Sequence, residues 1–105
     1  MCSRRVRDNY HLLGALGKCK PKYRKAILQN ADKELILAIC ECALNVANGN
    51  IPASKPVLNK LKKYKSKLRF LAHDKCSYKK KRDAIVQKGG NFLLALLPTV
   101  VSAIA

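Results

Sequence analysis

The sequence predicts an all-α protein: a small compact bundle of four or five short helices, followed by an apolar C-terminal helical segment. Two observations favour this class over a β-sheet protein. Apolar residues recur at the three- and four-residue spacing of a helix face, and runs that alternate apolar with polar residues are missing. The 105 residues suffice for one small domain with a thin core.

The first two expected helices are short. Val6, Tyr10 and Leu13 share one helical face, which predicts a helix that ends near Leu16. Pro21 suits the first turn of a second helix, because a residue at this position has no intrahelical hydrogen bond to donate.

The third expected helix has the clearest pattern. Residues 35–47 are apolar on almost every side, which is typical of a helix buried in a core. Asn30 or Asp32 can cap its N-terminus, and Asn48-Gly49 is a typical C-terminal stop.

Two further helices complete the expected body. Ser54 can cap a fourth helix that runs to Ala72, and Ser77 can cap a fifth that ends at Gly89. The fourth helix has an apolar stripe at helical spacing, formed by Val57, Leu61, Tyr64, Leu68 and Leu71. We expect Leu61 and Leu68 to be buried against residues 35–47.

Positive charge is extreme and unevenly placed. The net charge is +16, from 22 Lys/Arg against six Asp/Glu. Residues 55–82 hold twelve Lys/Arg against Asp74, and residues 1–25 hold eight against Asp8, whereas residues 26–54 have a net charge of −2. Such a surplus indicates a polyanionic partner, most often nucleic acid and less often an anionic membrane.

The type of cation favours DNA binding without sequence preference. Lysine supplies sixteen of the 22 cations, and it acts on a phosphate as a point charge rather than as a bidentate reader of a base. The predicted phosphate-binding residues are Arg4, Arg5, Arg7, Lys60, Lys62, Lys63, Lys67, Arg69, Lys79, Lys80, Lys81 and Arg82. Tyr23, Tyr64 and Tyr78 lie among lysines and are candidates for base stacking, although Tyr64 and Tyr78 also suit the core.

The sequence pattern does not favour an enzyme or a metalloprotein. The six acids are scattered, whereas acid–base catalysis needs paired groups in a cleft. The five cysteines are odd in number and include no CxxC, and with only two histidines we expect neither a metal site nor a cofactor. We expect free thiols and no signal peptide, and therefore a cytosolic or nuclear location.

Residues 91–105 carry no charge and follow the Gly89-Gly90 pair, so we divide the chain into a basic body, 1–90, and an apolar tail, 91–105. As a helix its last fourteen residues, 92–105, are about 21 Å long, short of the roughly 30 Å of a bilayer's hydrocarbon core. Three interpretations stay open: a last core helix, a membrane-associated segment, or a docking peptide for another protein. The glycine pair slightly favours a detachable or docking tail.

The stretch QKGGNFLLALLPTVVSAIA, residues 87–105, resembles the C-terminal end of the adenovirus precursor core protein X family. That family also passes from a basic region through Gly-Gly into an apolar, proline-containing tail, and similar proteins are encoded by adenovirus-like and Polinton-like elements. The resemblance implies DNA condensation in a virion, a location in the virion and the host nucleus, and cleavage by a viral protease between Gly90 and Asn91. Gln87 departs from the Met, Leu or Ile that the family prefers four residues before the cut.

Two other function classes remain as alternatives. One is a membrane-active protein, whose basic helices lie on anionic lipid while the tail inserts. The other is a structural protein whose tail contacts a capsid protein. Self-association into a homo-oligomer is compatible with each of these.

Overall fold

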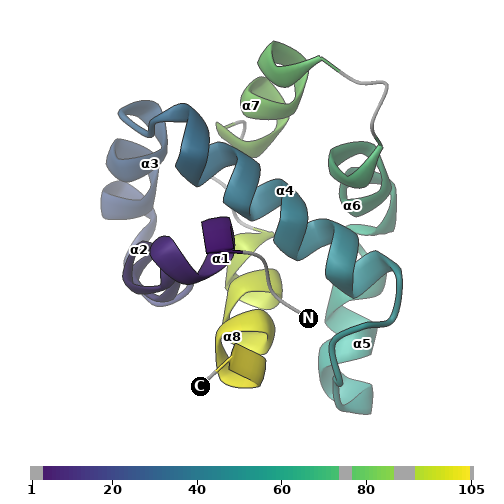
Figure 1. Ribbon diagram of the computed structural model, residues 1–105. Coiled ribbons are helices and arrows are strands. Elements are labelled where there is room, and N and C mark those ends of the chain that lie inside the picture. The colour runs from purple at the N-terminus through teal and green to yellow at the C-terminus, as the bar shows by residue number, and fades with distance from the viewer. Residues whose placement is uncertain (1–3, 74–76, 87–91, 105) are drawn as a thin grey trace.

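In the computed structural model, which describes residues 4–73, 77–86 and 92–104, every regular element is an α-helix (Figure 1). The helices are α1 (Arg4–Asp8), α2 (Tyr10–Leu16), α3 (Pro21–Gln29), α4 (Lys33–Ala47), α5 (Lys55–Lys62), α6 (Lys65–Ala72), α7 (Tyr78–Val86) and α8 (Leu93–Ile104). The predicted all-α class is confirmed. The body contains more helices than the four or five expected, because two expected helices are each divided in two.

Helix α4 is the central element, and it contacts α1, α6, α7 and α8. Its N-terminus is capped by Asp32, whose carboxylate accepts a hydrogen bond of 2.9 Å from the backbone N–H of Leu35. Gly49, with φ of 72°, follows the C-cap Asn48 and ends the helix. Both predicted signals therefore act as expected, and α4 supplies seven buried residues to the core.

The expected helix from Ser54 to Ala72 is interrupted at Tyr64, which separates α5 from α6. Tyr64 has φ of −111° and ψ of 16°, outside the helical region. No proline or glycine lies there, and the Tyr64 ring packs on Phe92 with a centroid distance of 6.2 Å. The interruption therefore coincides with a tertiary contact. Leu61 and Leu68 are each 5% exposed, which confirms their predicted burial.

The expected helix that ends near Leu16 is also divided, at Asn9. The side-chain amide of Asn9 donates a hydrogen bond of 2.8 Å to the carbonyl oxygen of Arg5. The same oxygen accepts the backbone N–H of Asn9 at 3.3 Å, so the side chain and the backbone of Asn9 share one acceptor at the break between α1 and α2. Val6, Leu13 and Leu16 remain buried on either side of it.

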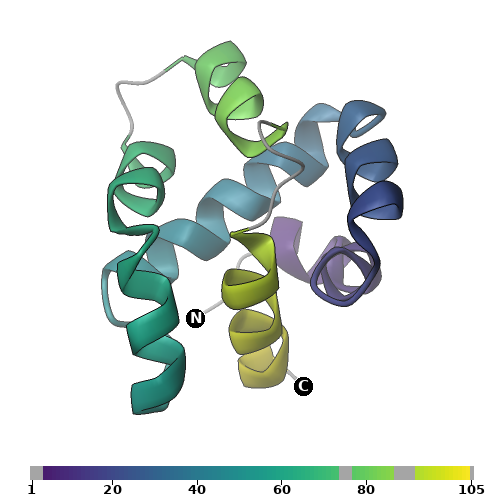
Figure 2. The ribbon, with the colours of Figure 1, turned by 180° about the vertical axis from the view of Figure 1, so that it is seen from behind.

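Helix α8 fills the centre of the fold, where Figure 2 shows it between α5 and α2. It contacts α2, α4 and α5. Its neighbour Phe92 is 1% exposed, and Leu93, Leu96, Leu97 and Val100 are fully buried. This packing matches the core-helix interpretation of residues 91–105 and disagrees with the slight preference for a detachable tail. In the described residues, no helix combines the length and the apolar character needed to cross a bilayer.

The approach of α8 to α2 is close at Gly17, immediately after α2. A methyl group placed on Gly17 would lie 3.1 Å from Cδ of Pro98 and 3.3 Å from Cβ of Leu97. A residue without a side chain therefore lets the two helices pack closely. Pro98 lies inside α8, and the hydroxyl of Thr99 donates to the carbonyl oxygen of Ala95 at 3.1 Å.

The expectation of free thiols is met where the structure describes the cysteines. Cys40 and Cys42 are buried on α4, Cys19 is half-buried, and all three are thiols outside any disulfide. Burial raises the pKa of the Cys40 thiol above its usual value, so Cys40 stays protonated at neutral pH. Cys2 and Cys76 lie outside the described residues.

Candidate nucleic-acid interface

The α5–α6 edge, residues 55–72, is the most strongly basic part of the described structure. It holds seven Lys/Arg and no Asp/Glu. Of the predicted residues, Lys60, Lys62, Lys63 and Arg69 are exposed here. None of these four residues forms an ion pair with a carboxylate in the described part of the chain. Their charge is therefore available to an external anion.

Lys67 differs from its neighbours on this edge. It is half-buried, and its Nζ lies 4.9 Å from the centroid of the Phe92 ring. The sequence prediction groups Lys67 with the phosphate-binding residues, but unlike Lys60, Lys62 and Lys63 it is not fully exposed to solvent. Because a cation over an aromatic face is attracted to it, Lys67 contributes to holding α6 against the start of α8.

Helix α7 presents only part of its predicted cationic face. Lys79 and Lys80 are exposed, whereas Lys81 and Arg82 are half-buried. The Nη2 of Arg82 donates a hydrogen bond of 3.0 Å to the carbonyl oxygen of Gln29, which ties α7 to the end of α3. Lys81 and Arg82, which the sequence analysis places among the phosphate-binding residues, are therefore less accessible to DNA than Lys79 and Lys80. Ser77 caps α7 as predicted, since its Oγ accepts from the N–H of Lys80 at 3.3 Å.

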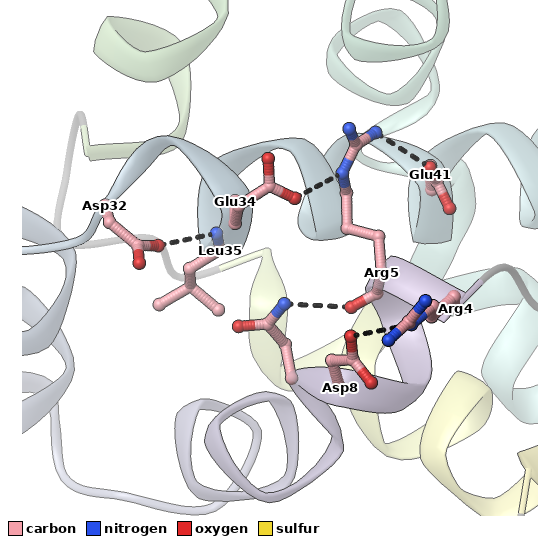
Figure 3. A network of polar contacts seen from close by, with 8 residues as sticks. Arg4, Arg5, Asp8, Asp32, Glu34, Leu35 and Glu41 are labelled. Atoms are coloured by element: carbon pink, nitrogen blue, oxygen red, sulfur yellow. Dashed lines mark hydrogen bonds and ion pairs between the residues drawn. The ribbon is translucent and has the colours of Figure 1, made fainter.

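The three cations of α1 have different environments, and Figure 3 shows those of Arg4 and Arg5. Arg5 bridges two carboxylates of α4: its Nε lies 2.8 Å from Glu34, and its Nη1 lies 3.0 Å from Glu41. Arg4 lies 3.6 Å from Asp8 in an exposed pair that contributes little to stability. Arg7 is exposed.

Arg5 is therefore a structural residue, which corrects its prediction as a phosphate ligand. The hydrogen bond with Glu34, together with the attraction of both carboxylates, raises the pKa of the Arg5 guanidinium above its usual value, although desolvation acts to lower it. Glu34 and Glu41 lie seven residues, or about two helical turns, apart on α4, and the separate donor nitrogens of the arginine reach one carboxylate each. Its effect is to hold α1 against α4.

Replacing Arg5 by Gln is expected to release α1 from α4 while leaving DNA affinity nearly unchanged. Amide hydrogen exchange over α1 should rise markedly, and it should rise less in Arg5→Lys, which keeps the charge but not the fork. A loss of DNA affinity equal to that of Lys60→Gln, with no faster exchange in α1, would restore Arg5 to the phosphate-binding set.

Sequence reasoning missed two features of the basic surface. Lys65 is exposed at the first position of α6, directly after the break at Tyr64. Arg24 was counted within the cationic block of residues 1–25, but it is fully buried, and its Nη1 donates to the carbonyl oxygen of Cys19 at 3.2 Å. The signal for its inward orientation is its spacing of one turn from Leu28.

Tyr23 and Tyr78, the two remaining candidates for base stacking, differ in their exposure to solvent. Tyr23 is 58% exposed on α3, whereas Tyr78 is half-buried with Nζ of Lys33 5.6 Å from its ring centroid.

Gly89 and Gly90, the predicted cleavage site, lie outside the described residues. Within the described residues no group of three or more His, Cys, Asp or Glu side chains is arranged to hold a metal ion.

Comparisons with models of protein families, with curated proteins and with solved structures found no match to this chain.

Proposed function

We propose that this protein binds double-stranded DNA through its phosphates, without sequence preference, and condenses the genome of a virus or virus-like mobile element. The observation that carries the proposal is the α5–α6 edge, with seven Lys/Arg and no carboxylate over residues 55–72. Lys79 and Lys80 are exposed on α7, the helix that contacts α6, and add two further cations near this edge. The viral setting, in virion and host nucleus, rests on the resemblance of residues 87–105 to the adenovirus core protein X family.

The size of the protein limits the number of phosphates that it can contact on one duplex. The longest dimension is 32 Å, and a duplex carries one negative charge per about 1.7 Å of its axis. About half of those charges face away from a protein that lies along one side. A footprint of this length is therefore compatible with about five to eight phosphate contacts.

The resulting prediction concerns salt. With about five to eight contacts, the slope of log affinity against log salt concentration should lie between roughly −4.5 and −7, because each contact releases condensed counterions. Random and defined duplexes should bind within a few-fold of each other. The measurement is a fluorescence-anisotropy titration at several salt concentrations, and a slope shallower than about −2 would contradict phosphate-dominated binding.

The same titration locates the interface. Changing Lys60, Lys62 and Lys63 to Gln should weaken binding equally for all sequences and flatten the slope by about one unit per residue. The helical circular dichroism should persist, since all three side chains are exposed. Vesicles of anionic lipid, titrated at the same ionic strength, form the comparison arm: tighter binding to vesicles than to DNA would favour the membrane-active class instead.

A further inference from the structure

A second basic edge lies across the molecule from α5 and α6. Four lysines in or just before α3 are exposed: Lys18, Lys20, Lys22 and Lys25. Figures 1 and 2 show α2 and α3 at one edge of the molecule and α5 and α6 at the opposite edge, with α4 crossing between them. The two groups of cations therefore belong to separate surfaces. We call the four lysines the α3 edge.

Arg24 explains why these lysines point outward. Its buried side chain reaches back to the carbonyl oxygen of Cys19, and this bond ties the connection between α2 and α3 to α3 itself. Leu28, one turn further on, is also fully buried, so this face of α3 is turned toward the core. Lys22 and Lys25, three residues apart, lie together on the outer side.

The α3 edge has no internal use for its charge. No ion pair to a carboxylate joins its four lysines within the described residues. Lys22 and Lys25 repel one another at this spacing and weaken the helix. Helix α3 contains no acidic residue that could offset their charge. An external polyanion removes that repulsion.

We propose that the α3 edge is a second duplex-binding surface, so that one protein molecule bridges two DNA duplexes. This inference rests on the proposed function and adds its mechanism of condensation. A straight duplex that lies along the α5–α6 edge cannot reach the opposite edge of a body about 30 Å wide. A second duplex can, and two surfaces on one rigid body convert binding into cross-linking.

The experiment measures bridging and single-duplex binding separately. One duplex is immobilised on beads and a second, fluorescently labelled duplex of unrelated sequence is free in solution, at about 0.15 M salt. Protein is added at a substoichiometric ratio to phosphate, so that general charge neutralisation does not precipitate the DNA. Capture of the free duplex reports bridging, and anisotropy with one labelled duplex reports single-duplex affinity.

Two variants each remove four positive charges, one from the α3 edge and the other from the α5–α6 edge. The first changes Lys18, Lys20, Lys22 and Lys25 to Gln, and the second changes Lys60, Lys62, Lys63 and Arg69 to Gln. The first should keep single-duplex affinity within about three-fold, because the Debye length of about 8 Å is far shorter than the distance across the protein. It should lose capture by about ten-fold or more. The second should lose capture and most of its single-duplex affinity, keeping only the weaker binding that the four lysines of the α3 edge supply.

Each other outcome contradicts a distinct statement. Capture by the first variant equal to wild type overturns the bridging role of the α3 edge. Equal loss of single-duplex affinity in both variants shows one continuous surface instead of two. Bridging by wild type only at concentrations where sedimentation detects dimers assigns it to self-association. If wild type binds DNA but captures nothing, the inference fails while the proposed function stands, and if wild type binds no duplex both are overturned.

Discussion

A protein that ends at Gly90 is expected to be unfolded or aggregated at 25 °C. The truncation removes Phe92, Leu93, Leu96, Leu97 and Val100, each at most 1% exposed in the intact protein. Burying a side chain of this size stabilises the fold by about 1.5–3 kcal/mol. A small domain has a net stability of only about 5–15 kcal/mol. Loss of five such side chains therefore removes most or all of it, and the exposed faces of α2, α4 and α5 promote aggregation.

The measurement is thermal unfolding by circular dichroism, with a matched pair of substitutions on α8 as control. Leu96 is fully buried and Leu94 is 46% exposed. Leu96→Ser should reproduce part of the truncation's effect, while Leu94→Ser should leave the melting temperature close to that of wild type. A 1–90 protein with wild-type melting temperature and DNA affinity would show that residues 91–105 are detachable after all.

This result would also constrain the processing implied by the resemblance to the adenovirus core protein X family. If a protease cuts after Gly90 in the folded protein, α8 has no covalent link to the body but remains held by its apolar contacts. Mass spectrometry of protein from particles should then find residues 91–105 as a separate peptide that copurifies with residues 1–90. Its absence, with DNA binding intact, would mean that the body is stable alone.

Leu71→Ala is expected to lower the free energy of unfolding by about 2–5 kcal/mol, the range observed for buried leucines. Leu71 is fully buried on α6, which packs directly on α4. The substitution removes apolar contacts and leaves a cavity that neighbouring helices fill only in part. On a domain of this size, such a loss brings the protein close to unfolding at 37 °C.

Urea denaturation checks this value, with Leu58→Ala as the matched control because it makes the same deletion at a leucine that is 46% exposed. The control should change the free energy of unfolding by no more than about 0.5 kcal/mol. An unchanged midpoint for Leu71→Ala would mean that α6 does not pack on α4 in solution without DNA. Equal effects of the two variants would point to the denatured state as the cause.

The sequence predicted the helical class and the ends of several helices because those depend on local signals. Asp32, Asn48-Gly49, Pro21 and Ser77 act within one turn of their own position, through caps and fixed backbone angles. The breaks at Asn9 and Tyr64 were not predicted. One coincides with the hydrogen bond of the Asn9 side-chain amide to Arg5, and the other coincides with the contact of Tyr64 with the Phe92 ring, 28 residues further on.

The sequence predicted the general position of the candidate interface. The predicted cations that are less available to this interface share one cause. Charge density identifies the α5–α6 edge because its surplus of cations is visible in the sequence. It does not show that Arg5 meets two carboxylates of α4, that Lys67 lies over Phe92 or that Arg82 reaches Gln29. Each of these contacts joins residues far apart in the chain, so the tertiary structure, and not the local pattern, decides which cations remain available.

The position of α8 has a consequence for how the protein is made. It follows every other described helix in the chain, yet it contacts α2, α4 and α5. A ribosome therefore releases the other described helices before the one that completes the core, and the fold closes only after α8 has emerged. During that interval the nascent chain exposes apolar surface and many cations next to ribosomal RNA, itself a polyanion. The speed with which α8 docks then determines how much newly made protein escapes RNA contact and aggregation.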